Sequence, residues 1–287
     1  RKSEFWAGID YDRTFGDHDI KFSTRVSRQV YSTFGNLDVK RQGISGRMTY
    51  GFKQRYFMDL TAGYSGSENF AVGRRFGFFP AVSAGWIISD EDFMKGSANF
   101  LDFLKIRGSF GLVGNDAIGS ARRFAFNDFF ARSSTGYTFG TGYTGVGGSA
   151  QLALANPFLT WEKAYKSSVG FDAKMFKQSL SISADYFYEN RKDLATGSLL
   201  PNILGQNLVF VNEGQASYKG FETGINYNKK IGQVNLNLFG NYTYQVSKIL
   251  AINEAANLPA YQKALGRPIT SVISPAATAT TGAGYIN

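Results

Sequence analysis

The stretch of sequence that decides the fold is Gln233-Val234-Asn235-Leu236-Asn237-Leu238-Phe239-Gly240-Asn241-Tyr242-Thr243-Tyr244-Gln245-Val246. Its even-numbered positions are apolar, aromatic or glycine, and its odd-numbered positions are polar apart from one phenylalanine. Only a β-strand sends alternate side chains to opposite faces so regularly. The pattern covers roughly the 9–11 residues that a tilted strand needs to cross a bilayer, with tyrosines near one end as at a membrane interface. We therefore expect a transmembrane β-strand here.

The same two-residue period recurs along the chain and predicts about ten strands. They are expected at 5–11, 20–30, 44–52, 56–64, 76–88, 104–113, 167–176, 180–188, 219–229 and 234–246. The predicted fold class is all-β, an antiparallel transmembrane β-barrel. Ten strands are not expected to complete the barrel, because the segment after Ser247 does not return to the membrane and ends in a low-complexity run at 276–284. We expect an incomplete segment of a larger barrel, lacking an N-terminal half and the last strands.

Connection lengths support a barrel, because outer-membrane barrels alternate short periplasmic turns with longer extracellular loops. Short turns are expected at 16–19, 53–54, 177–178 and 231–232, and long connections at 67–74, 114–159, 191–207 and 248–287. We expect 114–159 to be a long extracellular loop with no membrane strand, in which any strands near 124–130 form an external hairpin. The segment 248–287 is expected to be a truncated extracellular loop. The connection at 89–102 is long for a periplasmic turn, and Phe93, Phe100 and Leu101 are expected to pack a short helix there.

Composition narrows the class of protein. The chain has 287 residues, of which 43% are hydrophobic and 16% aromatic, so it is not generally disordered. No stretch approaches the roughly 20 apolar residues of a membrane helix, which leaves a barrel as the membrane fold. Cysteine is absent, so disulfides and thiolate zinc sites are excluded. The formal charge is +9, but Lys and Arg are scattered, and no nucleic-acid partner is expected. No signal peptide opens the chain, so the exported protein's true N-terminus is expected to lie upstream.

Motifs that carry chemistry elsewhere favour structural roles here. Gly140-x-Gly142-x-x-Gly145 matches a dinucleotide fingerprint, but no helix is expected to follow, so we interpret it as a glycine-rich loop. His18 is the only histidine and is expected to be a solvated turn residue. We predict neither a cofactor nor a metal site.

Two further motifs have structural explanations. The acidic run 90–92 suits the first turn of a short helix, where negative charge is favoured. The glycosylation pattern at Asn241 lies within a predicted strand and is attributed to chance. No triad, metal cluster or carboxylate pair remains, so the sequence predicts that the protein is not an enzyme.

Ionisable residues on the polar parity are candidates for contact with solute. Their natural place in a barrel is the wet interior, where they pair with one another, support a plug or touch solute. We expect pairing or plug support for most of them, and the sequence names no solute-binding residue. The set is Lys21, Arg25, Asp59, Lys105, Arg107, Asp172, Lys174, Asp185 and Glu222.

Five ordered blocks of sequence go beyond what periodicity predicts. They are RFGFFPAVSAGW at 75–86, LKIRGSFG at 104–111, NPFLTWEK at 156–163, DYFY at 185–188, and NEG at 212–214 with KGFE at 219–222. In order and spacing they resemble the SusC/RagA type of TonB-dependent outer-membrane transporter, over most of residues 50–268.

This resemblance implies a 22-stranded barrel with an N-terminal plug in the outer membrane of a Gram-negative bacterium. It implies import of a glycan or oligosaccharide, or of a peptide, driven through TonB and aided by a SusD-like surface lipoprotein. Outer-membrane lipid and lipopolysaccharide would surround the barrel. The plug and the TonB-contacting segment would lie outside residues 1–287.

Two other classes of function remain open on the sequence. A passive porin or adhesin barrel would share the strand pattern but lack the plug. A soluble all-β carbohydrate-binding module would bury the apolar parity in a packed core instead of presenting it to lipid. Detergent-dependent solubility would separate this module from both barrels.

Overall fold

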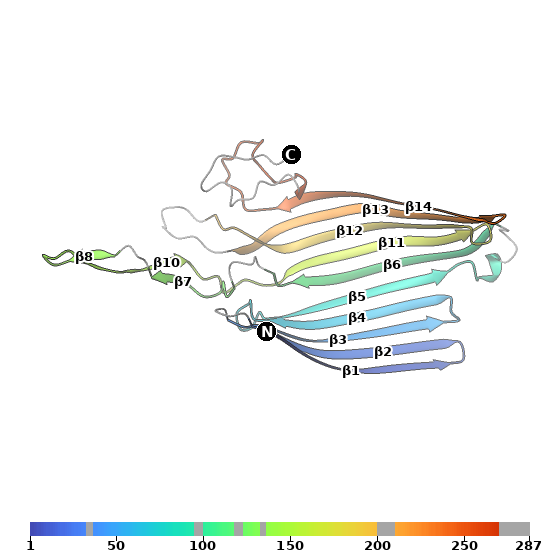
Figure 1. Cartoon of the computed structure of the whole chain (residues 1–287), viewed down its shortest axis with the longest axis horizontal. Coiled ribbons are helices and arrows are strands. Elements are labelled where there is room, and N and C mark those ends of the chain that lie inside the picture. The colour runs from blue at the N-terminus through green and yellow to red at the C-terminus, as the bar shows by residue number, and fades with distance from the viewer. Residues whose placement is uncertain (33–36, 95–99, 118–122, 133–135, 200–209, 270–287) are drawn as a thin grey trace.

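Ten strands form one antiparallel sheet in which every strand pairs with its neighbours in chain order (Figure 1). The computed structural model describes residues 1–32, 37–94, 100–117, 123–132, 136–199 and 210–269. The strands of the sheet are β1 Lys2–Phe15, β2 His18–Tyr31, β3 Val39–Phe52, β4 Tyr56–Ser67, β5 Phe76–Ile87, β6 Leu101–Asn115, β11 Glu162–Met175, β12 Leu180–Thr196, β13 Val211–Ile231 and β14 Val234–Ala251. The ten predicted strands and the fold class are confirmed.

Four short strands lie outside this sheet, between β6 and β11. They are β7 Phe129–Arg132, β8 Tyr137–Phe139, β9 Thr144–Val146 and β10 Ser149–Ala153. β7 pairs with β10, and β8 pairs with β9, so the segment forms a narrow hairpin that extends beyond the ends of the long strands (Figure 1). As expected, none of these strands joins the ten-stranded sheet.

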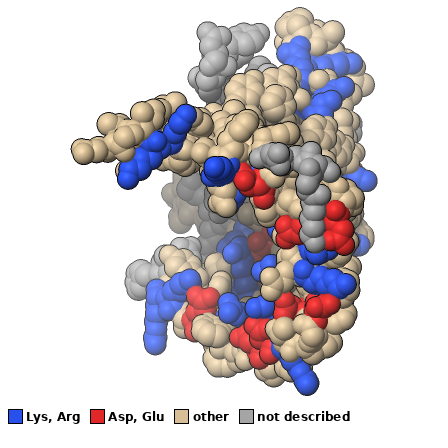
Figure 2. Space-filling view, turned by 90° about the vertical axis from the view of Figure 1, so that its right-hand side faces the viewer, with Lys and Arg blue, Asp and Glu red and all other residues tan. Residues whose placement is uncertain are grey.

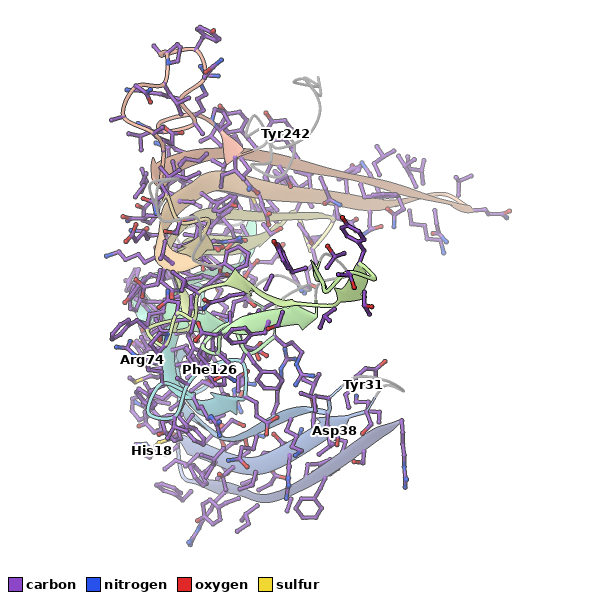
Figure 3. The ribbon with its side chains drawn as sticks, turned by 90° about the vertical axis from the view of Figure 1, so that its left-hand side faces the viewer. His18, Tyr31, Asp38, Arg74, Phe126 and Tyr242 are labelled. Carbon is purple, nitrogen blue, oxygen red and sulfur yellow. The ribbon has the colours of Figure 1, made fainter. Side chains whose placement is uncertain are left out.

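Seen end-on, the sheet is a curved wall with one hollow side (Figure 3). β1 and β14 are its two edges in the described part of the chain. Short turns join the strands at one end, and the long connections leave from the other (Figure 1). Among the described residues, no helix has the length and apolar content to cross a membrane.

The register confirms that the two parities of the sequence are two faces of the sheet. One row that crosses six strands consists of Tyr11, Phe22, Met48, Leu60, Val82 and Phe110, each opposite the next. All six side chains are exposed. A soluble sheet would cover such a face with a second layer, whereas a barrel presents it to lipid.

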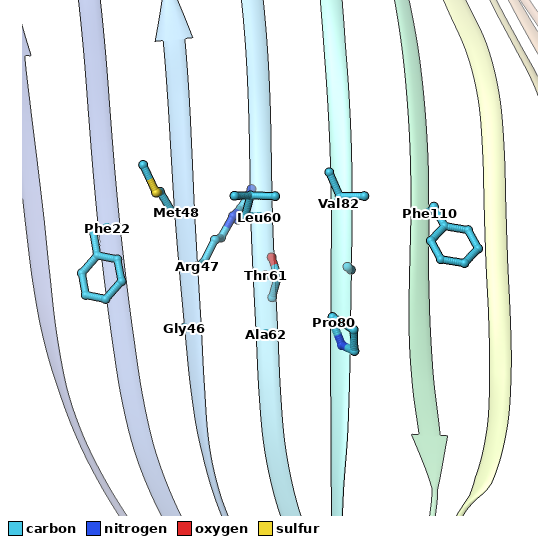
Figure 4. Close-up of a pocket in the computed structure, with 11 residues that line it drawn as sticks. Phe22, Gly46, Arg47, Met48, Leu60, Thr61, Ala62, Pro80, Val82 and Phe110 are labelled. Atoms are coloured by element: carbon cyan, nitrogen blue, oxygen red, sulfur yellow. The ribbon is translucent and has the colours of Figure 1, made fainter.

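A shallow depression crosses β3, β4 and β5 on the apolar face (Figure 4). Gly46, Ala62 and Pro80 are adjacent in register there. Their small side chains leave a hollow of about 450 Å³, bordered by the larger Leu60 and Val82. The lining is almost entirely apolar, which suits contact with acyl chains.

His18 is not a solvated turn residue, and that prediction is wrong. The turn is Gly16-Asp17, with Gly16 at φ 59°, and His18 is the first residue of β2. Its half-buried ring stacks on Phe15 at 5.5 Å between centroids and packs against Phe52 at 4.9 Å. Its Nδ1 lies 2.8 Å from the hydroxyl of Tyr50. Phe15, His18 and Phe52 are aligned in the register, so the hairpin places the imidazole between two outward-facing rings.

These rings begin an aromatic row along the short-turn end of the outer face. Phe52 stacks on Tyr56 at 6.2 Å, and Tyr56 stacks on Trp86 at 6.3 Å. Glu91 closes the row, because it accepts hydrogen bonds from the Tyr56 hydroxyl at 2.5 Å and from Trp86 Nε1 at 3.0 Å. Aromatic girdles of this kind mark the interfaces of membrane barrels.

The predicted helix in the connection after β5 is shorter than expected. It is a single 3₁₀ turn, η1 Asp92–Met94, with Asp92 in its first turn as the acidic run predicted. Leu101 does not join it, because Leu101 begins β6. Phe100 instead lies 6.3 Å from the ring of Phe176 in the turn after β11.

Toward the long-connection end, β5 and β6 are not paired, and we call this unpaired part the seam. The two strands pair only from Ala81 to Ile87 on the β5 side, although β5 itself begins at Phe76. Pro80 stands where this pairing starts and has no N–H to donate. The ring of Phe79 covers the seam so closely that a Cβ at Gly77 or Gly114 would overlap it. A Cβ at either position would therefore force the Phe79 ring to shift.

Candidate functional site

The polar face of the wall carries ion pairs between neighbouring strands. Lys21 donates to Asp12 at 2.8 Å between β2 and β1, and Arg47 donates from Nε to both carboxylate oxygens of Asp59 between β3 and β4 at 3.0 and 2.9 Å. Figure 2, which looks at the short-turn end, shows acidic and basic residues side by side around the hollow of the wall. Cross-strand pairs of opposite charge stabilise a sheet, but water screens pairs as exposed as Lys21 with Asp12, so each contributes little.

Arg107 on β6 forms the most extensive of these contacts. It donates from Nε to Asp172 on β11 at 3.0 Å and from Nη2 to Asp185 on β12 at 2.7 Å. The residue between Arg107 and Asp185 in the register is Gly170, and a Cβ there would overlap the Asp185 carboxylate. Gly170 therefore allows one guanidinium to join three strands.

A basin of about 340 Å³ lies beside this cluster on the polar face. Asp59, Lys105 and Arg107 contribute charge to its lining, and Ser83, Ser109 and Ser168 contribute hydroxyl groups. Lys105 Nζ lies 5.2 Å from the ring centroid of Phe57. The basin offers both signs of charge and several hydroxyls, which suits polar solutes or a plug segment.

The predicted lumenal residues separate into three groups, and Lys105, which lies over the ring of Phe57, belongs with the second. Pairing is confirmed for Lys21, Asp59, Arg107, Asp172 and Asp185. Arg25 and Lys174 lie over aromatic rings, at 4.8 Å from Trp6 and 5.8 Å from Phe103. Glu222 opposes Asp185 in the register and has no ion pair with another described residue.

Two partners were missed by the sequence reasoning, Asp12 and Arg47. Both lie on the polar parity of their strands, so the alternation was sufficient to place them on this face. The described residues contain no group of three His, Cys, Asp or Glu side chains arranged to hold a metal ion.

A second feature, which we call the loop-base cluster, lies where the long connections leave the sheet. Its buried members are Phe70, Ala125, Leu159 and Trp161, with Phe79, Phe129, Ala195 and Phe210 packed against them. Trp161 is 7% exposed, and its ring lies 5.4 Å from Phe70 and 5.1 Å from Phe79. Its Nε1 donates to the carbonyl of Arg75 at 3.1 Å. The cluster therefore joins the β4–β5 connection to the segment before β11.

Asparagine side chains tie two more connections to this cluster. Asn156 donates to the carbonyl of Phe210 at 2.6 Å. Asn212 donates to the carbonyl of Thr160 at 3.0 Å and accepts from the Thr160 backbone at 2.9 Å. These hydrogen bonds replace backbone pairing between the β6–β11 and β12–β13 connections, which stabilises the starting geometry of both loops.

Asp116 joins the end of β6 to β3 at the same level. Arg41 donates to both of its carboxylate oxygens, at 2.9 and 2.8 Å, and Asn69 donates to its carbonyl at 2.8 Å. The Asp116 side chain is only 11% exposed, so this pair is better shielded from water than those of the open wall. Three long connections and the end of β3 thus share one base.

Comparison with known proteins also identifies a β-barrel, over nearly the whole chain. Residues 2–287 match the model of the family described as TonB dependent receptor-like, beta-barrel. The chain belongs to this family of TonB-dependent receptors. Receptors of this family are outer-membrane β-barrels of Gram-negative bacteria, and they are transporters rather than enzymes.

Curated relatives are similar in sequence to most of the chain. It is 32% identical to TonB-dependent receptor P39 of Formosa agariphila over 76% of this chain, and 28% identical to TonB-dependent receptor SusC of Bacteroides thetaiotaomicron over 73%. The chain spans about a fifth of the length of these relatives, 21% and 20% respectively. The resemblance to the SusC type is confirmed.

Solved structures share the fold. The RagAB peptide transporter superposes with a TM-score of 0.78 at 18% identity, over 93% of this chain and 32% of that chain. The outer membrane transporter YddB from Escherichia coli gives a TM-score of 0.60 at 11% identity, over 86% of this chain and 33% of the other. At these identities the likeness concerns the fold: the ten strands correspond to about a third of a larger transporter chain.

Proposed function

We propose that this chain is the barrel part of an active importer in the outer membrane of a Gram-negative bacterium. The imported nutrient is a glycan or oligosaccharide, or a peptide. TonB supplies energy through segments outside residues 1–287, and a SusD-like surface lipoprotein delivers the solute. The observation that carries this proposal is the family match over residues 2–287, together with sequence similarity to a SusC receptor.

The geometry supports a solute path along the polar face. The charged basin and the Arg107 cluster line this face, and the hairpin β7–β10 extends over the hollow side at the long-connection end (Figure 3). The hairpin exposes Phe130 and Tyr143, whose rings suit contact with a solute or a lid protein. In this proposal 114–159 is an extracellular loop, and 248–287 is a second one, of which only residues up to 269 are described.

Uptake by cells tests the proposal. Deletion of the gene that encodes the full protein is expected to abolish growth on the imported glycan or peptide, and uptake in complemented cells is expected to stop when tonB is deleted. Uptake that continues without TonB favours a passive porin. Binding to whole cells without uptake favours an adhesin.

A variant pair tests the role of the hairpin. Tyr143→Ser is expected to raise the half-saturating solute concentration, because it removes an exposed ring from the proposed contact surface. Phe176→Ser removes an exposed ring at the short-turn end and serves as the matched control. Equal uptake by both variants would contradict a contact through Tyr143.

A further inference from the structure

Two cations occupy the apolar face of the wall at its long-connection end. Arg28 on β2 stands in a register row with Phe5, Gln42, Gly66 and Phe76. Lys40 on β3 lies one step further toward the connection, opposite Val30. Both share the parity of Val26 and Ile44, which belong to the lipid-facing face. Arg28 and Lys40 are therefore directed outward from the barrel.

Neither cation has a partner in the described part of the chain, where no ion pair or hydrogen bond of its side chain is found. This differs from the polar face, where Lys21, Arg47 and Arg107 each contact a carboxylate. Arg28 and Lys40 are diagonal neighbours across β2 and β3, so their Cβ atoms are roughly 7–8 Å apart. Two like charges at that distance repel each other unless an anion lies between them.

A concavity of about 250 Å³ lies beside these two residues. Arg28, Lys40, Arg41 and Arg75 line it, with Gln42, Ser67 and a single carboxylate, that of Glu68. Arg41 is already bound to Asp116, and Arg75 Nε donates to the carbonyl of Phe70 at 3.2 Å. Arg28 and Lys40 therefore remain available to a ligand, beside the single carboxylate of Glu68.

An aromatic pair fixes the depth of this concavity in the membrane. Phe76 forms part of its lining and stacks on Tyr64 at 5.1 Å with an angle of 11° between the rings. Tyrosine and phenylalanine gather at the level of the headgroups in membrane barrels. Arg28 is level with Phe76 in the register and Lys40 lies further toward the long-connection end, so both cations meet lipid headgroups rather than acyl chains.

We propose that Arg28, Lys40 and Gln42 bind a phosphate group of a phosphorylated glycolipid in the outer leaflet. Guanidinium and ammonium groups form charge-assisted hydrogen bonds with phosphate oxygens, and the Gln42 amide adds a neutral donor. The acyl chains of the same lipid lie along Val26 and Ile44. This inference rests on the proposed placement in the outer membrane with the long connections outside.

The test uses the full-length protein, purified in detergent and stripped of lipid. Native mass spectrometry measures binding of bis-phosphorylated lipid A, with dephosphorylated lipid A and inorganic phosphate as two further arms. We expect Arg28→Gln/Lys40→Gln to weaken lipid A binding at least tenfold. The matched control is Lys21→Gln/Arg25→Gln, which removes two cations from the other face of the same hairpin and is expected to leave lipid A binding unchanged.

Three results would overturn the proposal. The first is unchanged lipid A binding by Arg28→Gln/Lys40→Gln, and the second is equal binding of dephosphorylated lipid A by the unaltered protein. The third is inorganic phosphate displacing lipid A at equal concentration, which would identify a site for a free anion.

A separate measurement tests whether the long connections lie on the outer side of the outer membrane. Asp38→Cys in intact cells is expected to react with a membrane-impermeant maleimide. No labelling from outside, with lipid A binding intact, would contradict the orientation and not the phosphate site. Labelling without lipid A binding would contradict the site and leave the orientation standing.

Discussion

Arg107 on β6 donates from Nη2 to the Asp185 carboxylate on β12 at 2.7 Å, although β11 runs between the two strands. A side chain in a sheet normally contacts residues on the adjacent strand, either the residue directly opposite or its diagonal neighbours. Arg107 reaches further because Gly170, its neighbour on β11, has no side chain in the way. The contact between Arg107 and Asp185 therefore depends on Gly170, which has no side chain.

Gly170→Ala is expected to reduce the free energy of unfolding by about 1.5–3 kcal/mol, the range for hydrogen bonds to charged groups. The added methyl group would overlap the Asp185 carboxylate, separating it from Arg107, and would also overlap the backbone carbonyl of Ala184. Reversible unfolding of the full-length protein in lipid vesicles measures this. Gly108→Ala is the control, because its Cβ would meet only the Ser168 carbonyl at 3.7 Å. Equal stability of the two variants would show that the Arg107 to Asp185 contact contributes little.

Face assignment in β14 predicts unequal effects at two adjacent positions. Leu238 is 55% exposed on the apolar face opposite Tyr227, and Asn237 lies on the polar face opposite Asn228. Leu238→Lys is expected to cost about 2–4 kcal/mol near the bilayer midplane, and Asn237→Lys much less. Folding into lipid vesicles measures both, and equal costs would contradict the assignment.

Leu238→Phe separates lipid from a packed interior. Lipid accepts the larger ring with little change in stability. A close-packed core usually loses ~1–3 kcal/mol on overfilling, so a loss of that size would favour the soluble carbohydrate-binding module.

Trp161→Ala is expected to loosen several long connections together, because its ring packs between Phe70 and Phe79 and its Nε1 bonds to Arg75. Truncating a buried aromatic residue typically costs 3–5 kcal/mol. Limited proteolysis of the folded protein should then cut the β4–β5 and β6–β11 connections faster, at similar relative rates. Phe158→Ala, two residues after Asn156 and 70% exposed, is the control. Faster cutting at a single connection would show that the loop-base cluster does not couple them.

The pKa of Glu91 lies below its ordinary value, chiefly because its carboxylate accepts hydrogen bonds from Tyr56 and Trp86. Since the folded-state pKa is the lower one, the stabilisation is present above the unfolded value of about 4.3 and is lost as pH falls through the folded value. Glu91→Gln and Tyr56→Phe should each reduce this acid dependence of stability. Unfolding measured between neutral and acidic pH checks it, and Tyr64→Phe, which removes a hydroxyl elsewhere in the outer face, should retain it.

The excursion at 114–159 is expected to be accessible from outside intact cells. An epitope inserted at Gly142, in the turn between β8 and β9, should bind antibody without permeabilisation. An epitope in the β3–β4 turn at Gln54 should bind only after the outer membrane is opened. The reverse pattern would invert the proposed orientation.

Much of the wall could be predicted from the sequence, because lipid on one face and water on the other impose a strict alternation. The strand ends could not. β13 begins at Val211, not at the predicted 219, because beyond the bilayer the pairing continues with polar residues on both faces, such as Asn212 and Ser217. The pairing of Arg107 with Asp185 depends on the registers of two strand pairs at once, and the alternation of one strand does not contain that information. Sequence blocks indicated the family, and the structure shows that Trp161, Asn156 and Asn212 within those blocks hold the loops.

The seam between β5 and β6 has a consequence for how such a protein can diversify. Over residues 76–80 of β5, the ring of Phe79 and not backbone pairing lies between the two strands. β6 then leads directly into the long connection at 116–161. Backbone pairing is indifferent to side-chain identity, but it fixes strand spacing. Where side chains instead of backbone hydrogen bonds lie between two strands, substitution of those side chains can change the distance between the strands. Selection can therefore reshape the mouth of the barrel at this point, residue by residue, without altering the registers of the remaining wall.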